Sequence, residues 1–271
     1  MLAADPTPLP PFVRRLATWP AELLARERRL TLFAAVLLAL LVPMALAAGL
    51  DTRTLRGVDV WIKPMKFALS IALLSLTTTW FAGHLPAPQR SGRAMRWIVR
   101  LVIGAGGFEF VYIALQAALG QASHYNVGDV FHTAMYALMG IGAMLLTATQ
   151  PMLAWLLYRH PDRTQPVAYR RAVLIGLVLT FVLGAGVGTV LAGLQPPGGG
   201  PTVPLFGWSL AGGDLRPAHF VGIHAEQVLP VIGFALSSVY GRAAGKGVWL
   251  ATLAYLGAFA ALVAWGLPQS L

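Results

Sequence analysis

The sequence of 271 residues contains no cysteine. Disulfide bonds, thiolate metal sites, iron–sulfur clusters and cysteine nucleophiles all need a thiol, so this chain can form none of them. The absence leaves the redox compartment open, since a chain without thiols is compatible with an oxidising or a reducing environment.

Charged residues are scarce as well. Asp, Glu, Lys and Arg make up 11% of the chain, whereas 57% is apolar and the mean hydropathy is +0.67. An average soluble domain carries roughly a quarter of its residues as charges. The balance found here indicates a protein that lies in lipid, with no soluble domain of useful length.

Long apolar runs dominate what is present. Several of them reach about 20 residues, the length that crosses a hydrocarbon core of roughly 30 Å as a helix. They lie at 31–50, 64–83, 97–119, 130–158, 172–193, 218–240 and 247–267. We therefore predict an all-α integral membrane protein in which about seven transmembrane helices form one bundle over residues 31–271.

The segment before the first run, residues 1–30, is predicted to be a cytoplasmic, basic and amphipathic arm. Phe12, Leu16 and Trp19 are spaced to rest on the inner leaflet of the lipid bilayer, and a solvated arm is the alternative. The run MALAAG (44–49) also resembles a signal cleavage site. The basic segment of about 30 residues that precedes the apolar stretch is too long for an ordinary secretory signal.

The 20 lysines and arginines are sorted by loop and form no single patch or stripe, which argues against a nucleic-acid surface despite the net charge of +10. Because loops rich in these residues remain in the cytoplasm, the N-terminus is predicted inside, the C-terminus outside, and the protein in a bacterial inner membrane. Fifteen lie on the predicted inner side: Arg14, Arg15, Arg26, Arg28, Arg29, Arg90, Arg93, Arg96, Arg100, Arg159, Arg163, Arg170, Arg171, Arg242 and Lys246. Five lie on the outer side: Arg53, Arg56, Lys63, Lys66 and Arg216.

Four of the predicted helices carry polar residues on one face at 100° per residue. Ionisable groups in a membrane are costly and normally face a protein interior or water, so we expect these stripes to converge on one pocket. The alternative is that they are interhelical hydrogen bonds worth roughly 0.6 kcal/mol each. Glu109 and Glu226 are the candidate catalytic or proton-handling residues. The stripes are Lys63, Lys66, Ser70 and Thr77; Glu109, Tyr112 and Gln116; Asp129, His132 and Tyr136; and His219 and Glu226.

Histidines locate the pocket toward the external face. His124, His132, His219 and His224 lie on that side and are candidate cofactor ligands, the last three also candidate metal ligands. His84 and His160 lie among cytoplasmic arginines, where ordinary solvated side chains are expected. On a continuous helix His219 and His224 point roughly 140° apart, so they cannot both face one ion, and no HExxH motif is present.

Glycine and proline mark two further features. The stretch from Leu194 to Pro217 is too rich in both to form a regular helix, and a loop of this length is usually functional or disordered. The run 172–193 contains Gly176, Gly184, Gly186 and Gly188, and the last three include a Gly-x-x-x-Gly pair that is predicted to permit close helix packing.

Three segments resemble a family of uncharacterised bacterial integral membrane proteins: WIKPMKFALS (61–70), LQAALGQASHYN (115–126) and GWSLAGGDLRPAHFVGIHAEQVLP (207–230). The resemblance covers most of the chain from the second to the sixth predicted helix and implies no activity. The residues in these segments that we expect to carry the function are Lys63, Lys66, His124, Asn126, Asp214, Arg216, His219, His224, Glu226 and Gln227.

Three functions fit these residues. The first is a haem b-like redox protein in which His132 pairs with His219 or His224 as axial ligands, while Lys63, Lys66 and Arg216 bind propionates. The second is a transporter or receptor for a small solute or ion that uses the same pocket. In this hypothesis Glu109 and Glu226 are proton or cation partners, and Lys63 and Lys66 face anions.

The third function is a metal-dependent membrane hydrolase. In this hypothesis His124 or His132, Asp129 and a histidine of the run 218–240 hold Zn²⁺ and an activated water. A bound chromophore favours the first function, stoichiometric zinc favours the third, and the absence of both favours the second.

The charge asymmetry predicts the topology. Reporters fused after Gly92 and Pro161 should report the cytoplasm, and reporters after Gly128 and Gly199 the external side, because only the first two follow arginine-rich loops. Inverted signals at all four sites would contradict the orientation, and a cytoplasmic signal at the C-terminus would remove one helix from the count.

Overall fold

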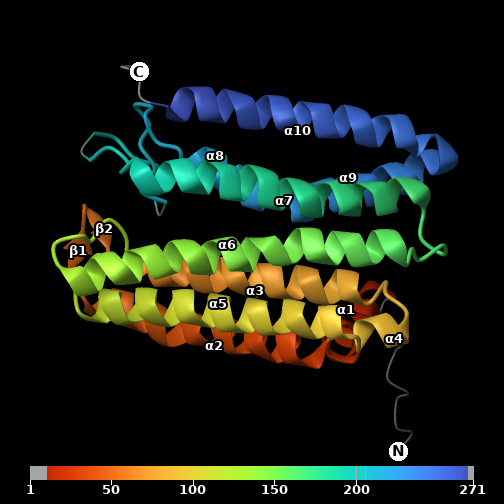
Figure 1. Cartoon of the computed structure of the whole chain (residues 1–271), viewed down its shortest axis with the longest axis horizontal. Helices are drawn as coiled ribbons and strands as arrows, with labels where there is room; N and C mark the ends of the chain where they lie inside the picture. Colours follow the sequence, from red (N-terminus) through yellow and green to blue (C-terminus); the bar gives the residue numbers. More distant parts are fainter. Residues whose placement is uncertain (1–10, 199, 205, 268–271) are drawn as a thin grey trace, which may run out of the picture.

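The computed structural model describes residues 11–198, 200–204 and 206–267, and the chain is almost wholly helical, with 77% helix and 2% strand (Figure 1). The elements are α1 (Pro11–Arg26), α2 (Arg28–Leu50), β1 (Thr54–Leu55), β2 (Val58–Asp59), α3 (Ile62–Ala82), α4 (Ala87–Arg90), α5 (Arg93–Ala118), α6 (Val130–Arg159), α7 (Val167–Gly193), α8 (Arg216–Ile223), α9 (Ala225–Tyr240), the 3₁₀ turn η1 (Gly241–Ala243) and α10 (Ala244–Gly266).

Six of these helices are long and apolar enough to cross a membrane: α2, α3, α5, α6, α7 and α10. The pair α8 and α9 forms a seventh if its two parts count as one span. The chain is therefore a multi-pass helical membrane bundle, and the predicted runs coincide with these helices to within a few residues.

The predicted continuous helix over 218–240 is wrong in one respect. It is interrupted at His224, where α8 and α9 meet at an angle of 51°. The argument that His219 and His224 point 140° apart assumed an unbroken helix, so it does not hold for this chain.

The bundle has two distinct ends (Figure 1). We call the end with the antiparallel pair β1–β2 the hairpin end, and the end with α1 and α4 the α1 end. The last turn of α10 lies at the hairpin end, since the Gly213 N–H donates to the carbonyl of Trp265 at 3.2 Å. The chain therefore enters its first span and leaves its last one at opposite ends.

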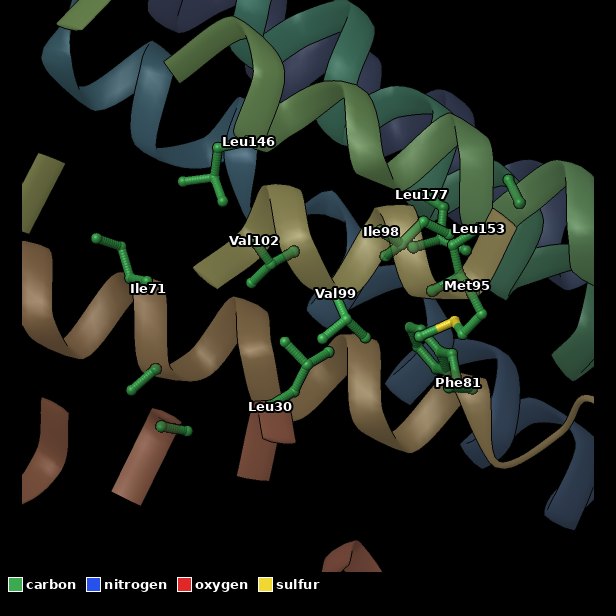
Figure 2. Close-up of a cluster of buried hydrophobic side chains, with 14 of the residues drawn as sticks. Leu30, Ile71, Phe81, Met95, Ile98, Val99, Val102, Leu146, Leu153 and Leu177 are labelled. Atoms are coloured by element: carbon green, nitrogen blue, oxygen red, sulfur yellow. The ribbon is translucent and has the colours of Figure 1, made fainter. Parts of the chain in front are cut away.

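The helices form two groups joined by α6 and α7. In one group α2 packs on α3, α3 on α5, and α5 on α6 (Figure 1). In the other group α7 packs on α8 and α9, and α10 packs on α8 and α9 as well. Figure 2 shows the main apolar core, which gathers side chains from α2, α3, α5, α6 and α7. Its labelled members are Leu30, Ile71, Phe81, Met95, Ile98, Val99, Val102, Leu146, Leu153 and Leu177.

Small residues bring α7 against the broken helix. A Cβ on Gly176 would lie 2.8 Å from the Ala225 carbonyl oxygen, and one on Gly184 would lie 2.7 Å from the Ile223 side chain. Gly188 faces His219, whereas nothing lies within 4 Å of a Cβ on Gly186. Close packing through the α7 glycines is thus confirmed for Gly176, Gly184 and Gly188.

This contact generates a stability prediction. Gly176→Val should lower the free energy of unfolding by about 1–3 kcal/mol, because the added side chain meets backbone that must shift. Thermal unfolding of the detergent-purified protein, followed by circular dichroism, measures the loss. Gly186→Val is the matched control on the same helix and should change the midpoint little; an equal loss in both variants would point to helix propensity and not to packing.

Candidate functional site

The loop between α7 and α8 folds over the hairpin end and is held there by cations. The Nζ of Lys66 donates to the Phe206 carbonyl at 3.0 Å, Nη2 of Arg216 donates to the Gly207 carbonyl at 2.7 Å, and Arg56 donates to the carbonyl of Pro196. Side chains from α3, α8 and the β1–β2 turn therefore hold the loop by its backbone.

An aromatic layer lies beneath this loop. Phe206 and Trp208 have ring centroids 4.5 Å apart, Trp208 and Phe220 are 5.4 Å apart, and Phe220 and His224 are 4.3 Å apart. The layer leads from the loop to the break between α8 and α9.

Arg216 pairs with Asp214 and not with an external anion. Its Nη2 lies 2.6 Å and its Nε 2.9 Å from the carboxylate, which also accepts from the Ser209 N–H at 2.9 Å and from the Arg216 N–H at 3.0 Å. Burial raises the pKa of Asp214, but the bonds from Arg216 and Ser209 outweigh it and lower the pKa below its usual value. Asp214 is fully buried, so this pair is the anchor of the loop.

The expectation that Lys63, Lys66 and Arg216 all face an anionic ligand must therefore be corrected for Arg216, whose charge Asp214 already neutralises. Arg53 is similarly paired with Asp51 at 2.7 Å. Lys66 gives one bond to the loop and keeps further donors, because an ammonium has three. Within the described part of the chain Lys63 has no hydrogen bond or ion pair, and its nearest recorded partner is the Phe67 ring, 6.0 Å from Nζ.

The break at His224 frees backbone groups that neighbouring helices satisfy. The Glu226 N–H donates to Oγ1 of Thr180 on α7 at 2.9 Å, and the hydroxyl of Tyr255 on α10 donates to the Val221 carbonyl. The Val221 carbonyl also accepts from the His224 N–H at 3.2 Å. In lipid an unsatisfied backbone group costs several kcal/mol, so Thr180 and Tyr255 help to make the interruption tolerable. Neither residue lies in a motif, so the sequence alone does not single them out.

A chain of side-chain hydrogen bonds connects the break to α3. His224 donates from Nδ1 to Oε1 of Gln227 at 3.1 Å, and Nε2 of Gln227 donates to Thr77 Oγ1 at 3.1 Å and to Glu226 Oε1 at 3.0 Å. We call this interface between α3 and the α8–α9 break, with Lys63, Lys66, Thr77, His219, His224, Glu226 and Gln227, the polar seam.

Buried atoms in and beside the polar seam lack partners. Among the residues that the structure describes, His224 Nε2, Glu226 Oε2 and Glu109 Oε1 are buried without a hydrogen bond. Glu226 is 0% and Glu109 3% exposed. Since buried polar atoms are nearly always bonded, these three are places where a water, ion or solute fits the chemistry.

Glu109 on α5 lies behind the hairpin end of the seam. It is within electrostatic range of Lys63, although the two form no ion pair, and a Cβ on Gly142 of α6 would lie only 2.9 Å from Oε1. Glycine at position 142 therefore leaves room for this carboxyl.

His124 lies in the loop between α5 and α6, at the edge of the seam. Its ring is 6.0 Å from Phe67 and 5.7 Å from Tyr136, and Nδ1 lies 3.3 Å from the Ser123 hydroxyl. Burial lowers the pKa of His124 well below its usual range, and the nearby charge of Lys63 lowers it further. The imidazole is therefore neutral at pH 7.

The remaining histidines have different surroundings. Nδ1 of His219 donates to the Gly184 carbonyl at 3.0 Å, because a carbonyl can only accept. In the neutral imidazole Nε2 therefore carries the free lone pair. His132 uses both nitrogens, toward Asp129 at 2.5 Å and Gln121 at 3.1 Å, and lies in a separate groove between α5 and α6 with Tyr112 and Gln116. The four stripes thus form two groups and not one.

His84 differs from the expectation of a solvated side chain. It is 10% exposed, and its Nε2 lies 3.2 Å from the Tyr169 hydroxyl and Nδ1 3.8 Å from Asp162. Burial lowers its pKa, with a further contribution from Arg26. Packing of the loops at the α1 end, which no local pattern reveals, accounts for the difference.

No group of three or more His, Asp or Glu side chains in the described ranges is arranged to hold a metal ion. The zinc set of His132, His219 and His224 is divided between the groove and the seam. The hydrolase hypothesis gains no geometric support from this arrangement.

Comparisons with known proteins give no assignment: no protein-family model, curated protein or solved structure matches the chain. The case for function therefore depends on the geometry of the polar seam.

The Asp214 anchor generates a pH prediction. The pKa of Asp214 is lower in the folded chain than its ordinary value of about 3.9 in the unfolded chain. The carboxylate therefore stabilises the fold above about pH 3.9, and this stabilisation is lost as pH falls through the folded-state pKa. Asp214→Asn should cost about 1.5–3 kcal/mol at pH 7, because the bonds to a charged carboxylate are weakened, and the cost should shrink as pH falls toward about 3.

Thermal unfolding between pH 7 and pH 3 measures this difference. Asp59→Asn is the control: Asp59 accepts from the Trp61 N–H at 2.7 Å, and an amide oxygen can replace that acceptor. A loss for Asp214→Asn that is the same at every pH would show that the carboxylate charge is not what stabilises the loop.

Proposed function

We propose that the chain is a bacterial inner-membrane carrier for a small anionic solute, coupled to protonation of Glu226. In this proposal the N-terminus is cytoplasmic, α8 and α9 together form one of seven spans, and the hairpin end faces the periplasm. The arginine-rich loops at the α1 end and the opposite ends of the first and last spans support this orientation.

The observation that carries the proposal is the interrupted helix with unpartnered polar atoms at its break. Interrupted helices near the middle of the membrane are the usual location of solute and coupling-ion sites in secondary transporters. Along the helices Glu109 and Glu226 lie roughly 15 Å from the hairpin end at about 1.5 Å per residue, and the bend of 51° between α8 and α9 makes the depth of Glu226 smaller. Both therefore lie between the hairpin end and the middle of a core about 30 Å thick.

The charges around the seam favour an anion. Lys63 is unpaired among the described residues, Lys66 has donors to spare, and the amino end of α9 directs its positive dipole end toward the break. An ionised Glu226 would repel an anion bound at the seam, whereas a protonated Glu226 would not. Proton uptake at Glu226 would therefore accompany solute binding, which is the basis of coupling.

A haem b site is a second candidate, favoured by one specific observation. His219 has Nδ1 fixed by a backbone carbonyl and Nε2 available, the arrangement in which an imidazole ligates iron. His132 is a poor partner, because both of its nitrogens are engaged, whereas His124 is within electrostatic range of His219. A Soret band that His219→Ala abolishes and His160→Ala preserves would establish this candidate, and a colourless, metal-free protein would exclude it.

Transport is tested in proteoliposomes that contain a pH-sensitive dye. An inward gradient of inorganic phosphate, acetate or succinate should drive proton uptake by the parent, and Glu226→Gln should reduce that uptake at least about tenfold by removing the titrating group. Lys63→Met should raise the solute concentration needed for half-maximal flux, whereas Lys246→Met, an exposed cation at the α1 end, should not.

Folding is controlled in the same experiment. Glu109→Ala and Glu226→Ala should accumulate and insert nearly as well as the parent, because removing a buried acid also removes its desolvation cost. If both fail to accumulate, the acids are structural members of a polar network. Undiminished flux in a well-folded Glu226→Gln variant would contradict the coupling.

A further inference from the structure

A second site lies apart from the polar seam, in a groove of about 690 Å³ on the bundle surface between α5 and α6. Its size is within the range of small-molecule sites. Most of its lining is apolar: Gly107, Phe108, Val111, Leu115, Leu119, Phe131 and Met135, with Tyr112, Gln116, Gln121 and His132 as the polar members.

Two of these polar side chains are buried without a partner. Tyr112 is 5% and Gln116 2% exposed, and neither the Tyr112 hydroxyl nor Gln116 Oε1 has a hydrogen bond within the described structure. They are one helical turn apart on α5, so both lie on the face that lines the groove. A hydrocarbon chain would fill the groove and leave both atoms unsatisfied.

The chemistry of the two atoms defines the ligand group. A tyrosine hydroxyl needs an acceptor for its proton, and an amide oxygen needs a donor. A single ligand hydroxyl can accept from Tyr112 and donate to Gln116. The head of the ligand therefore carries a hydroxyl.

The groove also favours a flat head at its hairpin end. There Phe131 packs edge-on against His132 at 5.3 Å, whereas Phe108, stacked on Tyr112 with centroids 6.5 Å apart, lies farther along the groove. His132 is held between Asp129 and Gln121, so the polar lining gathers toward the start of α6 while Gly107 and Phe108 lie deeper in the membrane. An aromatic ring fits the head position and an apolar tail fits the rest.

We propose that the α5–α6 groove binds a membrane-soluble ligand with a hydroxylated aromatic ring on an apolar tail, which is the chemistry of an isoprenoid quinol. Tyr112 and Gln116 read the hydroxyl, Phe131 contacts the ring, and Phe108 contacts the tail. The site uses none of the residues of the polar seam and does not depend on the carrier proposal.

Binding of decylubiquinol to the full chain in lipid nanodiscs, under anaerobic conditions, tests the proposal. Tyr112→Phe and Gln116→Leu should each weaken binding about 2–10-fold, the effect of one neutral hydrogen bond. Tyr136→Phe removes a hydroxyl that donates to Ala192 outside the groove and should leave the affinity unchanged. Val111→Trp should abolish binding by filling the groove, whereas Val182→Trp, similarly exposed on α7, should not.

Three outcomes would overturn the assignment. Equal binding of the dimethyl ether of the probe would show that the site does not recognise the hydroxyl. Tighter binding of dioctanoylglycerol would show that the site does not recognise the aromatic ring. Full binding by Val111→Trp would place the ligand elsewhere. Thermal unfolding should find Tyr112→Phe as stable as the parent, because the hydroxyl it removes makes no bond within the described chain. A loss of affinity without loss of stability is therefore attributable to the site.

Discussion

The requirement that every backbone polar group be satisfied within the membrane governs the centre of this molecule. At His224 the helix is interrupted, the Glu226 N–H donates to Thr180 of α7, and the Val221 carbonyl accepts from Tyr255 of α10 as well as from the His224 N–H. These bonds are within reach because glycines let α7 approach the break closely. The α7 glycines, the hydroxyls of Thr180 and Tyr255, and the buried Glu226 thus all belong to the helix break, and the polar seam forms around it.

The five cations at the hairpin end serve different purposes. Arg53 and Arg216 are neutralised by aspartates two residues away, and Arg56 and Lys66 bind carbonyls of the loop between α7 and α8. Their retention on the arginine-poor side is therefore largely structural. Lys63 differs, because it lies within electrostatic range of Glu109 without forming an ion pair, and it has no hydrogen bond among the described residues.

The sequence was sufficient to predict the spans, since hydropathy over about 20 residues is a direct consequence of the solvent that surrounds them. It also placed Lys63 and Glu109 on facing helices, because their periodicity puts them on buried stripes. The helix break was not predictable. Pro230 is six residues beyond His224, and the interruption is stabilised by Thr180 and Tyr255, which are distant in sequence and have no local signature.

The division of the polar stripes between two sites was equally hidden. Asp129 and His132 have the right spacing for a common face, but only packing decides that this face meets α5 and not α8. His84 is buried for the same reason, through contacts with Tyr169 and Asp162 that depend on how two loops meet. Residues of this kind become identifiable once the neighbours of each helix are known.

The unequal attachment of the two helix groups has a mechanical consequence. Along one side α6 and α7 pack over their length, whereas on the other the side-chain link recorded between α3 and α9 in the described residues is the bond from Gln227 to Thr77. The α7 glycines hold α7 close to the α8–α9 break. The other ties between the two groups lie at the hairpin end, where Lys66 and Arg56 hold the loop, and in the main core, to which α7 contributes Leu177. A small separation of α3 from α9 would therefore break the one bond beside Glu226 and widen the surroundings of that carboxyl while the other ties remain.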